Sequence, residues 1–206
     1  MKKTDNYAIQ MAQAQRRFLT YDQEQILQKC PLPYDDTYFY PVMLGQRYRL
    51  HRQTGSLERQ QGGNWQDANQ FGPVMTLLDW ICDCKPNRQL AGTMTGIQNF
   101  GHQFHQNLAE GGQDPVADRF DRDPASFHRA CKALGGTPLP GCDMGYAVEL
   151  FDRLPIGIKF WHSDEEFPAQ IRWFLDANAL QYLRYETMYY AVGLLKGLLL
   201  EKAMLY

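Results

Sequence analysis

An acidic cluster that follows a histidine is the segment of the sequence best suited to chemistry. His162 is followed, after one intervening residue, by Asp164, Glu165 and Glu166. Hard cations prefer several carboxylate oxygens, and a neutral imidazole adds a ligand for a transition metal. At the end of a strand, these groups could converge on a ligand or a metal ion. The alternative is a solvated turn that the Asp164 side chain caps and that Phe167 anchors in the core.

Two further histidines have a spacing that a helix brings onto one face. His102 and His105 are three residues apart, which places their Cβ atoms about 5–6 Å apart on a helix. Tetrahedral zinc needs three or four protein ligands, so His128, His162 or Cys131 would have to complete the set through the fold. The alternative is a pair of surface histidines.

The cysteines do not form a recognisable metal or disulfide framework. The chain has five, an odd number scattered along the sequence: Cys30, Cys82, Cys84, Cys131 and Cys142. Small disulfide-rich domains have a denser and even set. Cys82 and Cys84 are separated by one residue, and no second pair follows at zinc-ribbon spacing. We therefore expect reduced thiols, and the spacings give no support for an iron–sulfur cluster.

A basic strand face is the third candidate for ligand binding. Arg47, Arg49 and His51 alternate with Tyr48 and Leu50, which predicts a strand with one apolar face. The arginines could hold a phosphate or a carboxylate through bidentate contacts, or the face could be the ordinary polar side of a half-exposed sheet. Because Lys plus Arg number 21 against 23 for Asp plus Glu, the charge argues against a broadly basic nucleic-acid binder.

Familiar catalytic and targeting signals are missing from the sequence. It has no Gly-x-Ser-x-Gly, no phosphate-binding loop ending in Lys-Ser or Lys-Thr, and no dinucleotide fingerprint. The longest apolar run, near 193–200, is too short to span a bilayer. The polar N-terminal residues do not resemble a signal peptide. We therefore expect a cytoplasmic protein without a membrane or nucleic-acid partner.

The elements that must position these residues predict an α+β fold in a single domain over 1–206. We expect two antiparallel β-meanders packed with helices, with a long C-terminal helix that covers a sheet. The expected segments are a helical N-terminal segment (5–30, with helices at 6–18 and 22–29), a first meander (36–59), a polar loop (60–70), a helical middle (73–134, with helices at 102–109 and from Asp123), a second meander (145–175) and a C-terminal helix (178–205).

The C-terminal helix has an unusually broad apolar arc. Met188, Val192, Leu195 and Leu199 recur at helical spacing, and several neighbouring apolar residues widen the stripe. Such a helix must be covered on most sides. The cover could be the sheet or a second subunit, so a homodimer through this helix is one expectation.

The last third of the chain resembles a known family. The run 154–169 reads LPIGIKFWHSDEEFPA: an apolar strand with an aromatic end, a short gap, and then Asp-Glu-Glu-Phe-Pro. A Phe-Leu-Asp step at 174–176 and Glu186 near the start of the last helix continue the pattern. This pattern resembles domain of unknown function 3786, specifically here and loosely over most of the chain. The resemblance implies a cytoplasmic protein of anaerobic bacteria and archaea, sometimes beside iron–sulfur or corrinoid-linked proteins, and it implies no established activity.

The function that we predict from the sequence is a non-catalytic accessory protein of anaerobic metabolism that binds a small ligand or cofactor. The alternatives are a metal-dependent enzyme with a His/Asp/Glu site and a protein-interaction module. The sequence names no cofactor. The predicted ligand-binding residues are His162, Asp164, Glu166, Arg47 and Arg49, and the predicted metal ligands are His102 and His105.

Overall fold

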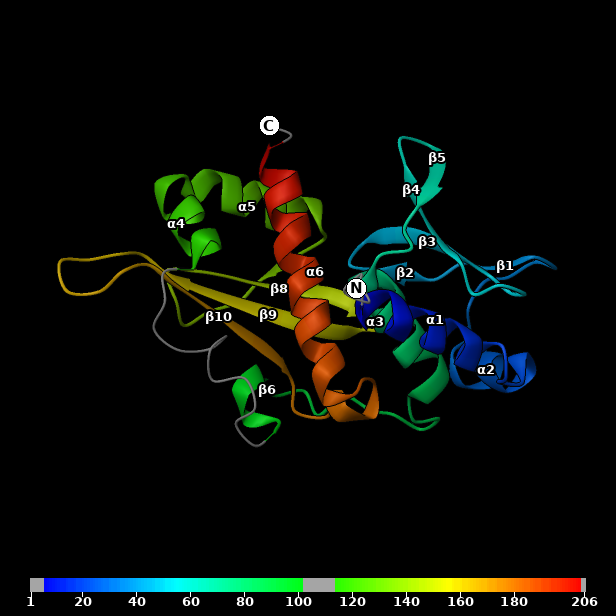
Figure 1. Cartoon of the computed structure of the whole chain (residues 1–206). Coiled ribbons are helices and arrows are strands. Elements are labelled where there is room, and N and C mark those ends of the chain that lie inside the picture. The colour runs from blue at the N-terminus through cyan, green and yellow to red at the C-terminus, as the bar shows by residue number, and fades with distance from the viewer. Residues whose placement is uncertain (1–5, 102–113, 205–206) are drawn as a thin grey trace. The chain divides into compact units, whose positions relative to one another are not determined.

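The computed structural model describes residues 6–101 and 114–204, which form two compact units (Figure 1). The first unit contains the residues up to Gln89 together with Gln181–Ala191. The second contains Leu90–Leu180 together with the residues from Val192 onward. This division does not test the predicted single domain, which stays a prediction. The α+β class is confirmed, with helices and two antiparallel sheets.

The first unit contains one antiparallel sheet, in the order β1-β3-β4-β5 with β2 also paired to β3. Its strands are β1 (Tyr38–Phe39), β2 (Val42–Met43), β3 (Gln46–His51), β4 (Leu57–Gln61) and β5 (Asn64–Asp67). Its helices are α1 (Asn6–Phe18), α2 (Gln23–Lys29), α3 (Phe71–Asp83) and the first part of α6 (Tyr185–Met204). The predicted alternation in β3 is confirmed, because Tyr48 and Leu50 are buried while Arg47 is exposed.

The predicted polar loop over 60–70 is wrong. β4 continues to Gln61, and β5 pairs with it through a hairpin whose turn is Gly62 and Gly63. Both glycines have positive φ, +57° and +84°. A two-residue hairpin turn of this hand needs left-handed backbone, which glycine adopts without steric cost. The Gly-Gly pair was therefore a hairpin signal inside a polar stretch.

The helix predicted over 6–18 is confirmed in its bounds. Its sequence places Ala8, Ile9, Ala12 and Phe18 roughly on one side, but of these only Phe18 is buried. Ala14 and Phe18 are buried, whereas Ala8 and Ala12 are exposed and Ile9 is 40% exposed. The reason is tertiary, because the part of α1 that packs on α3 decides which side chains are covered.

The helix predicted over 22–29 is confirmed as α2, and its first predicted residue, Asp22, is the N-cap. The Asp22 carboxylate accepts a hydrogen bond of 2.9 Å from the backbone N–H of Glu24. This bond satisfies one of the amide groups that a helix N-terminus leaves unpaired.

Asp79 is a buried carboxylate that connects α3 to the start of α6 within the first unit. It accepts the backbone N–H of Arg184 at 2.9 Å and lies 3.1 Å from the Arg184 Nε. Arg17 approaches it to 4.0 Å and forms a closer ion pair, of 2.7 Å, with Asp83. Burial raises the pKa of Asp79, and hydrogen bonds from Arg184 and Thr187 oppose the increase.

The second unit contains a five-stranded antiparallel sheet in the order β6-β10-β9-β8-β7. Its strands are β6 (Met94–Gly96), β7 (Thr137–Pro138), β8 (Met144–Phe151), β9 (Leu154–Trp161) and β10 (Gln170–Asp176). Its helices are α4 (Pro115–Arg122), α5 (Pro124–Ala133) and the rest of α6, and short 3₁₀ helices span Ile97–Asn99 and Ala179–Gln181. The second meander is thus confirmed as β8, β9 and β10.

Capping residues in the sequence explain where α4 and α5 of the second unit begin. Asp123 accepts the backbone N–H of Ser126 and caps α5, as predicted. The sequence prediction missed α4, although Asp114 caps it in the same way through the N–H of Val116. The helix predicted over 102–109 lies outside the described residues.

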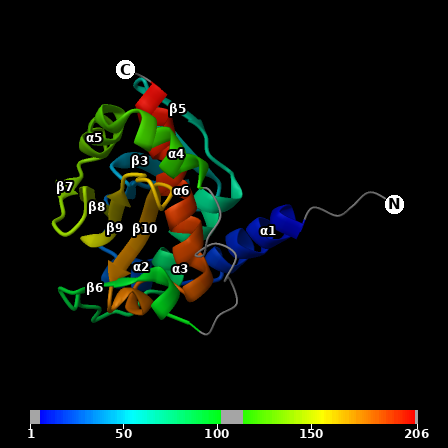
Figure 2. The same cartoon turned by 90° about the vertical axis from the view of Figure 1, so that its left-hand side faces the viewer.

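The C-terminal helix covers one face of the second sheet, as predicted. The part of α6 from Val192 onward runs across β8, β9 and β10 (Figures 1 and 2). Lys196 places its Nζ 5.3 Å from the centre of the Trp173 ring on β10. Val192, Leu195 and Leu199 are buried, so the chain itself covers the apolar arc at these positions. None of the described helices has the length and apolar character needed to cross a bilayer.

Asp79→Ala should destabilise the protein by about 1–3 kcal/mol, since it removes a buried acceptor and leaves the Arg184 backbone N–H and the Thr187 side chain without their hydrogen-bond partner. Urea unfolding followed by circular dichroism measures the change. Asp36→Ala, at an exposed position, is the matched control and should leave the midpoint unchanged. A loss at Asp79 no larger than that of the control would contradict the role of this carboxylate.

Candidate functional site

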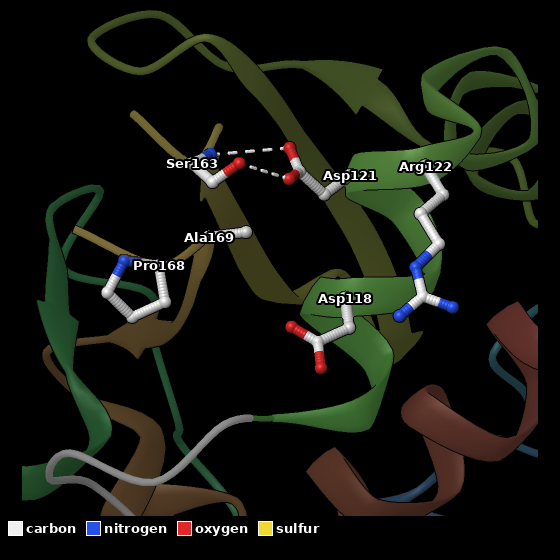
Figure 3. A pocket seen from close by; sticks show the side chains of 6 residues that line it. All are labelled: Asp118, Asp121, Arg122, Ser163, Pro168 and Ala169. Atoms are coloured by element: carbon white, nitrogen blue, oxygen red, sulfur yellow. Dashed lines mark hydrogen bonds between the residues drawn. The ribbon is translucent and has the colours of Figure 1, made fainter. Parts of the chain in front are cut away.

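The Asp-Glu-Glu-Phe-Pro segment borders a pocket of about 300 Å³ in the second unit (Figure 3). One wall comes from α4, and the other comes from the connection between β9 and β10. The lining residues are Asp118, Asp121, Arg122, Ser163, Pro168 and Ala169. The pocket therefore combines charged side chains from a helix with the segment that the sequence marked as the best candidate.

The Asp121 carboxylate joins the two walls. One oxygen lies 2.8 Å from His162 Nδ1, and the other accepts the Ser163 hydroxyl at 2.6 Å (Figure 3 draws the Ser163 bonds). The backbone N–H of Ser163 donates a third bond to Asp121, of 3.3 Å. On the other side, Asp143 accepts the backbone N–H of His162 at 2.8 Å. Together these bonds fix the chain direction as it leaves β9.

The same bonds determine the charge of Asp121 and the tautomer of His162. Hydrogen bonds from Ser163 and then from His162 lower the pKa of Asp121 below its ordinary value, so the carboxylate is ionised at neutral pH. An ionised carboxylate only accepts hydrogen bonds, so Nδ1 of His162 must carry the hydrogen. In a neutral imidazole, Nε2 is then left with a lone pair that can accept a proton or bind a ligand.

Two opposite charges in the pocket have no partner in the described part of the chain. Asp118 and Arg122 lie one helical turn apart on α4, and Figure 3 shows both side chains reaching from the same side of the helix. Within residues 6–101 and 114–204, neither side chain forms a hydrogen bond or an ion pair. In contrast, Arg119 on the same helix pairs with Asp123 at 3.7 Å. The pocket thus offers one available anion and one available cation.

The structure gives Asp164 a turn-capping role. Its carboxylate accepts the backbone N–H groups of Glu166 at 2.9 Å and Phe167 at 2.7 Å. This geometry favours the solvated turn over a ligand role for Asp164. The predicted anchoring of Phe167 in the core is wrong, because this side chain is 58% exposed. Asp164 and Glu166 do not line the pocket, and His162 is brought together with Asp121 instead.

The predicted anion site belongs to the first unit, and one of its arginines is already engaged. Arg49 makes two bonds to the Glu58 carboxylate, of 2.6 and 2.9 Å. Its guanidinium lies 4.5 Å from the Tyr38 ring centre and 4.9 Å from that of Trp65. Arg47 is exposed on the same face of β3. The alternative of an ordinary polar sheet face therefore describes Arg49 better, and an anion site at Arg47 stays a prediction.

The predicted metal ligands His102 and His105 lie outside the described residues. Among the residues that the structure describes, no group of three or more His, Cys, Asp or Glu side chains could hold a metal ion.

The sequence reasoning missed three pocket residues, Asp118, Asp121 and Arg122, because it did not predict α4. A signal for that helix was present. Asp114 followed by Pro115 is the same cap-and-proline start as Asp123 followed by Pro124 at the beginning of α5.

Comparison with known proteins identifies a family and no characterised relative. The family model described as a domain of unknown function, DUF3786, matches residues 22–197. No curated protein and no solved structure matches the chain. The chain therefore belongs to the DUF3786 family.

Ser163→Ala should raise the pKa of Asp121 towards the ordinary value, because the Ser163 hydroxyl is the largest contributor to its decrease. Carboxyl NMR titration measures the midpoint. Asp123 serves as the internal control, since its lowered pKa depends first on the backbone N–H of Ser126.

The Asp121 network also has a pH signature. A folded-state pKa below the unfolded one means that the carboxylate stabilises the fold above the unfolded value, near 3.8. This contribution to stability is lost as the pH falls through the lower folded-state pKa.

In the NMR titration, an Asp121 titration midpoint that is the same in wild type and Ser163→Ala would contradict the network.

Proposed function

We propose that this protein is a non-catalytic accessory protein that binds a small ligand in the pocket between α4 and the β9–β10 connection. The observation that carries the proposal is the pair of available charges, Asp118 and Arg122, on one side of α4 and facing a pocket of about 300 Å³. Ionised side chains at a pocket wall are a cost unless water or a ligand satisfies them. A pocket of this volume is at the lower end of the range for small-molecule sites.

The charges indicate the chemical class of the ligand. Arg122 suits a carboxylate or phosphate oxygen, because guanidinium donates two parallel hydrogen bonds to such groups. Asp118 suits an ammonium group. A small molecule with both charges, such as an α-amino acid, would satisfy both side chains at once. The Ser163 hydroxyl and Pro168 add one polar and one apolar contact on the opposite wall.

A second candidate function is favoured by one specific observation, the pairing of His162 with Asp121. A carboxylate that orients an imidazole through Nδ1 leaves Nε2 available as a general base, an arrangement that many enzymes use. An enzyme that acts on a ligand beside His162 is therefore the alternative proposal. Chemical turnover of a bound ligand that is lost in His162→Gln would favour it over a binding protein.

The localisation, the metabolic role and the oligomeric state are also proposals. The family resemblance supports a cytoplasmic protein with a role in anaerobic metabolism. The broad apolar arc of α6 supports a homodimer, although Val192, Leu195 and Leu199 are already buried within the chain. Light scattering of the purified protein would decide the oligomeric state.

An amino-acid panel tests the proposed ligand class, with each member matched by a carboxylate and an amine of the same length. At least one amino acid should bind, and Arg122→Gln and Asp118→Asn should each weaken its binding about tenfold or more, the usual effect of losing a hydrogen bond to a charged group. Isothermal titration calorimetry measures affinity, and amide NMR shifts locate the site.

Arg119→Gln is the matched control, since it removes a cation from the same helix but from outside the pocket lining. It should bind the amino acid as the wild type does. The proposed ligand class is wrong if the matched carboxylates or amines bind as tightly as the amino acid. It is also wrong if Arg119→Gln and Arg122→Gln weaken binding equally.

A further inference from the structure

Two cysteine thiols that are distant in the sequence are in contact in the first unit. Cys30 Sγ lies 3.2 Å from Cys84 Sγ, although 54 residues separate them in the chain. Each is the residue that ends a helix, Cys30 after α2 and Cys84 after α3. Both have extended backbone there, and both donate their N–H to the last turn of their own helix. The contact is therefore made by two fixed helix ends.

Hydrogen bonds between the two segments hold these ends together. The Lys29 ammonium donates to the carbonyl of Cys82 at 2.6 Å. The Arg88 guanidinium donates to the carbonyl of Lys29 at 2.8 Å and to that of Lys85 at 3.1 Å. A disulfide has its sulfur atoms about 2.05 Å apart, so the two thiols need to approach by roughly 1 Å. Small side-chain rotations can supply this movement without separating the helix ends.

The surroundings distinguish Cys30 from the neighbouring thiol Cys82. The Arg88 guanidinium lies 3.8 Å from Cys30 Sγ, and an adjacent positive charge stabilises a thiolate. Cys82, two residues before Cys84, has no sulfur contact of this kind in the described part of the chain. Burial raises the pKa of Cys82 to about 12, and the charges of Arg17 and Lys29 oppose the increase. Because Cys30 is buried as well, the sulfur contact with Cys84 is what distinguishes Cys30 from Cys82.

We propose that Cys30 and Cys84 are a reversible redox pair that a hydroperoxide oxidises to an intramolecular disulfide. The Cys30 thiolate attacks one oxygen of hydrogen peroxide, the O–O bond breaks, and the products are a sulfenic acid and hydroxide. Cys84 then attacks the Cys30 sulfur, so that the S–S bond forms and the S–O bond breaks. In sum, two thiols and one peroxide give one disulfide and two waters.

The burial of both cysteines determines the kind of oxidant. Cys30 and Cys84 are 0% and 3% exposed, so a small hydroperoxide can reach them more readily than a bulky disulfide reagent. A thiol reductant reverses the reaction by exchange. Closing a long loop restricts the unfolded chain, so the disulfide is expected to stabilise the first unit. The proposal does not rest on the ligand pocket and can fail or succeed independently of it.

Peroxide treatment of the intact protein tests the pair. After exposure to hydrogen peroxide and alkylation of the remaining thiols, mass spectrometry should find two fewer thiols and a peptide that joins Cys30 to Cys84. The thermal midpoint should rise by about 5 °C or more, as the stabilisation from a long closed loop predicts. Dithiothreitol should restore both the thiol count and the midpoint.

Cys82→Ser is the matched control. It removes a buried thiol from α3, the helix that ends at Cys84, and the variant should still form the Cys30–Cys84 disulfide on oxidation. Cys30→Ser and Cys84→Ser should each abolish it. The peptide mapping uses the wild-type chain, so it decides the question even if a variant does not fold. The proposal is wrong if oxidation joins Cys142, joins two chains, or leaves Cys30 and Cys84 unlinked while other thiols react.

Discussion

The candidate site depends on the hydrogen bonds that the Asp121 carboxylate accepts. They come from His162 and Ser163, which lie 41 and 42 residues further along the chain. These bonds attach α4 to the segment that follows β9, and they position the two walls of the pocket. The hydrogen bonds already satisfy the Asp121 carboxylate. In the proposed site, a ligand would therefore neutralise Asp118 and Arg122 and not Asp121.

The first unit uses a carboxylate for a comparable purpose at a buried position. Asp79 on α3 accepts the N–H that precedes α6 and lies beside the guanidinium groups of Arg17 and Arg184. Desolvation raises its pKa, whereas hydrogen bonds lower that of the more accessible Asp121. The two carboxylates therefore differ in environment. Asp79 fixes the start of α6, and Asp121 attaches α4 to the segment that follows β9. The Cys30–Cys84 contact lies at the opposite, C-terminal ends of two helices.

The sequence was most informative where a local pattern was sufficient. Asp22 and Asp123 predicted helix starts, the alternation around Tyr48 predicted β3, and the apolar spacing from Met188 predicted α6. It was wrong where a local signal was present but was not used, as at the Gly62-Gly63 hairpin, or where packing selected the face, as at Ile9. The family was already indicated by the Asp-Glu-Glu-Phe-Pro run, and its membership is confirmed over residues 22–197.

The sequence alone determined the α+β class and placed the candidate chemistry near His162, since caps, turns and hydrophobic periodicity act within a few residues. Tertiary structure decided that His162 meets Asp121 and not Asp164 or Glu166, because Asp164 is engaged by the backbone of its own turn. It also decided that Cys30 meets Cys84 across 54 residues. Contacts of this kind depend on how helices and strands pack, which no local spacing specifies.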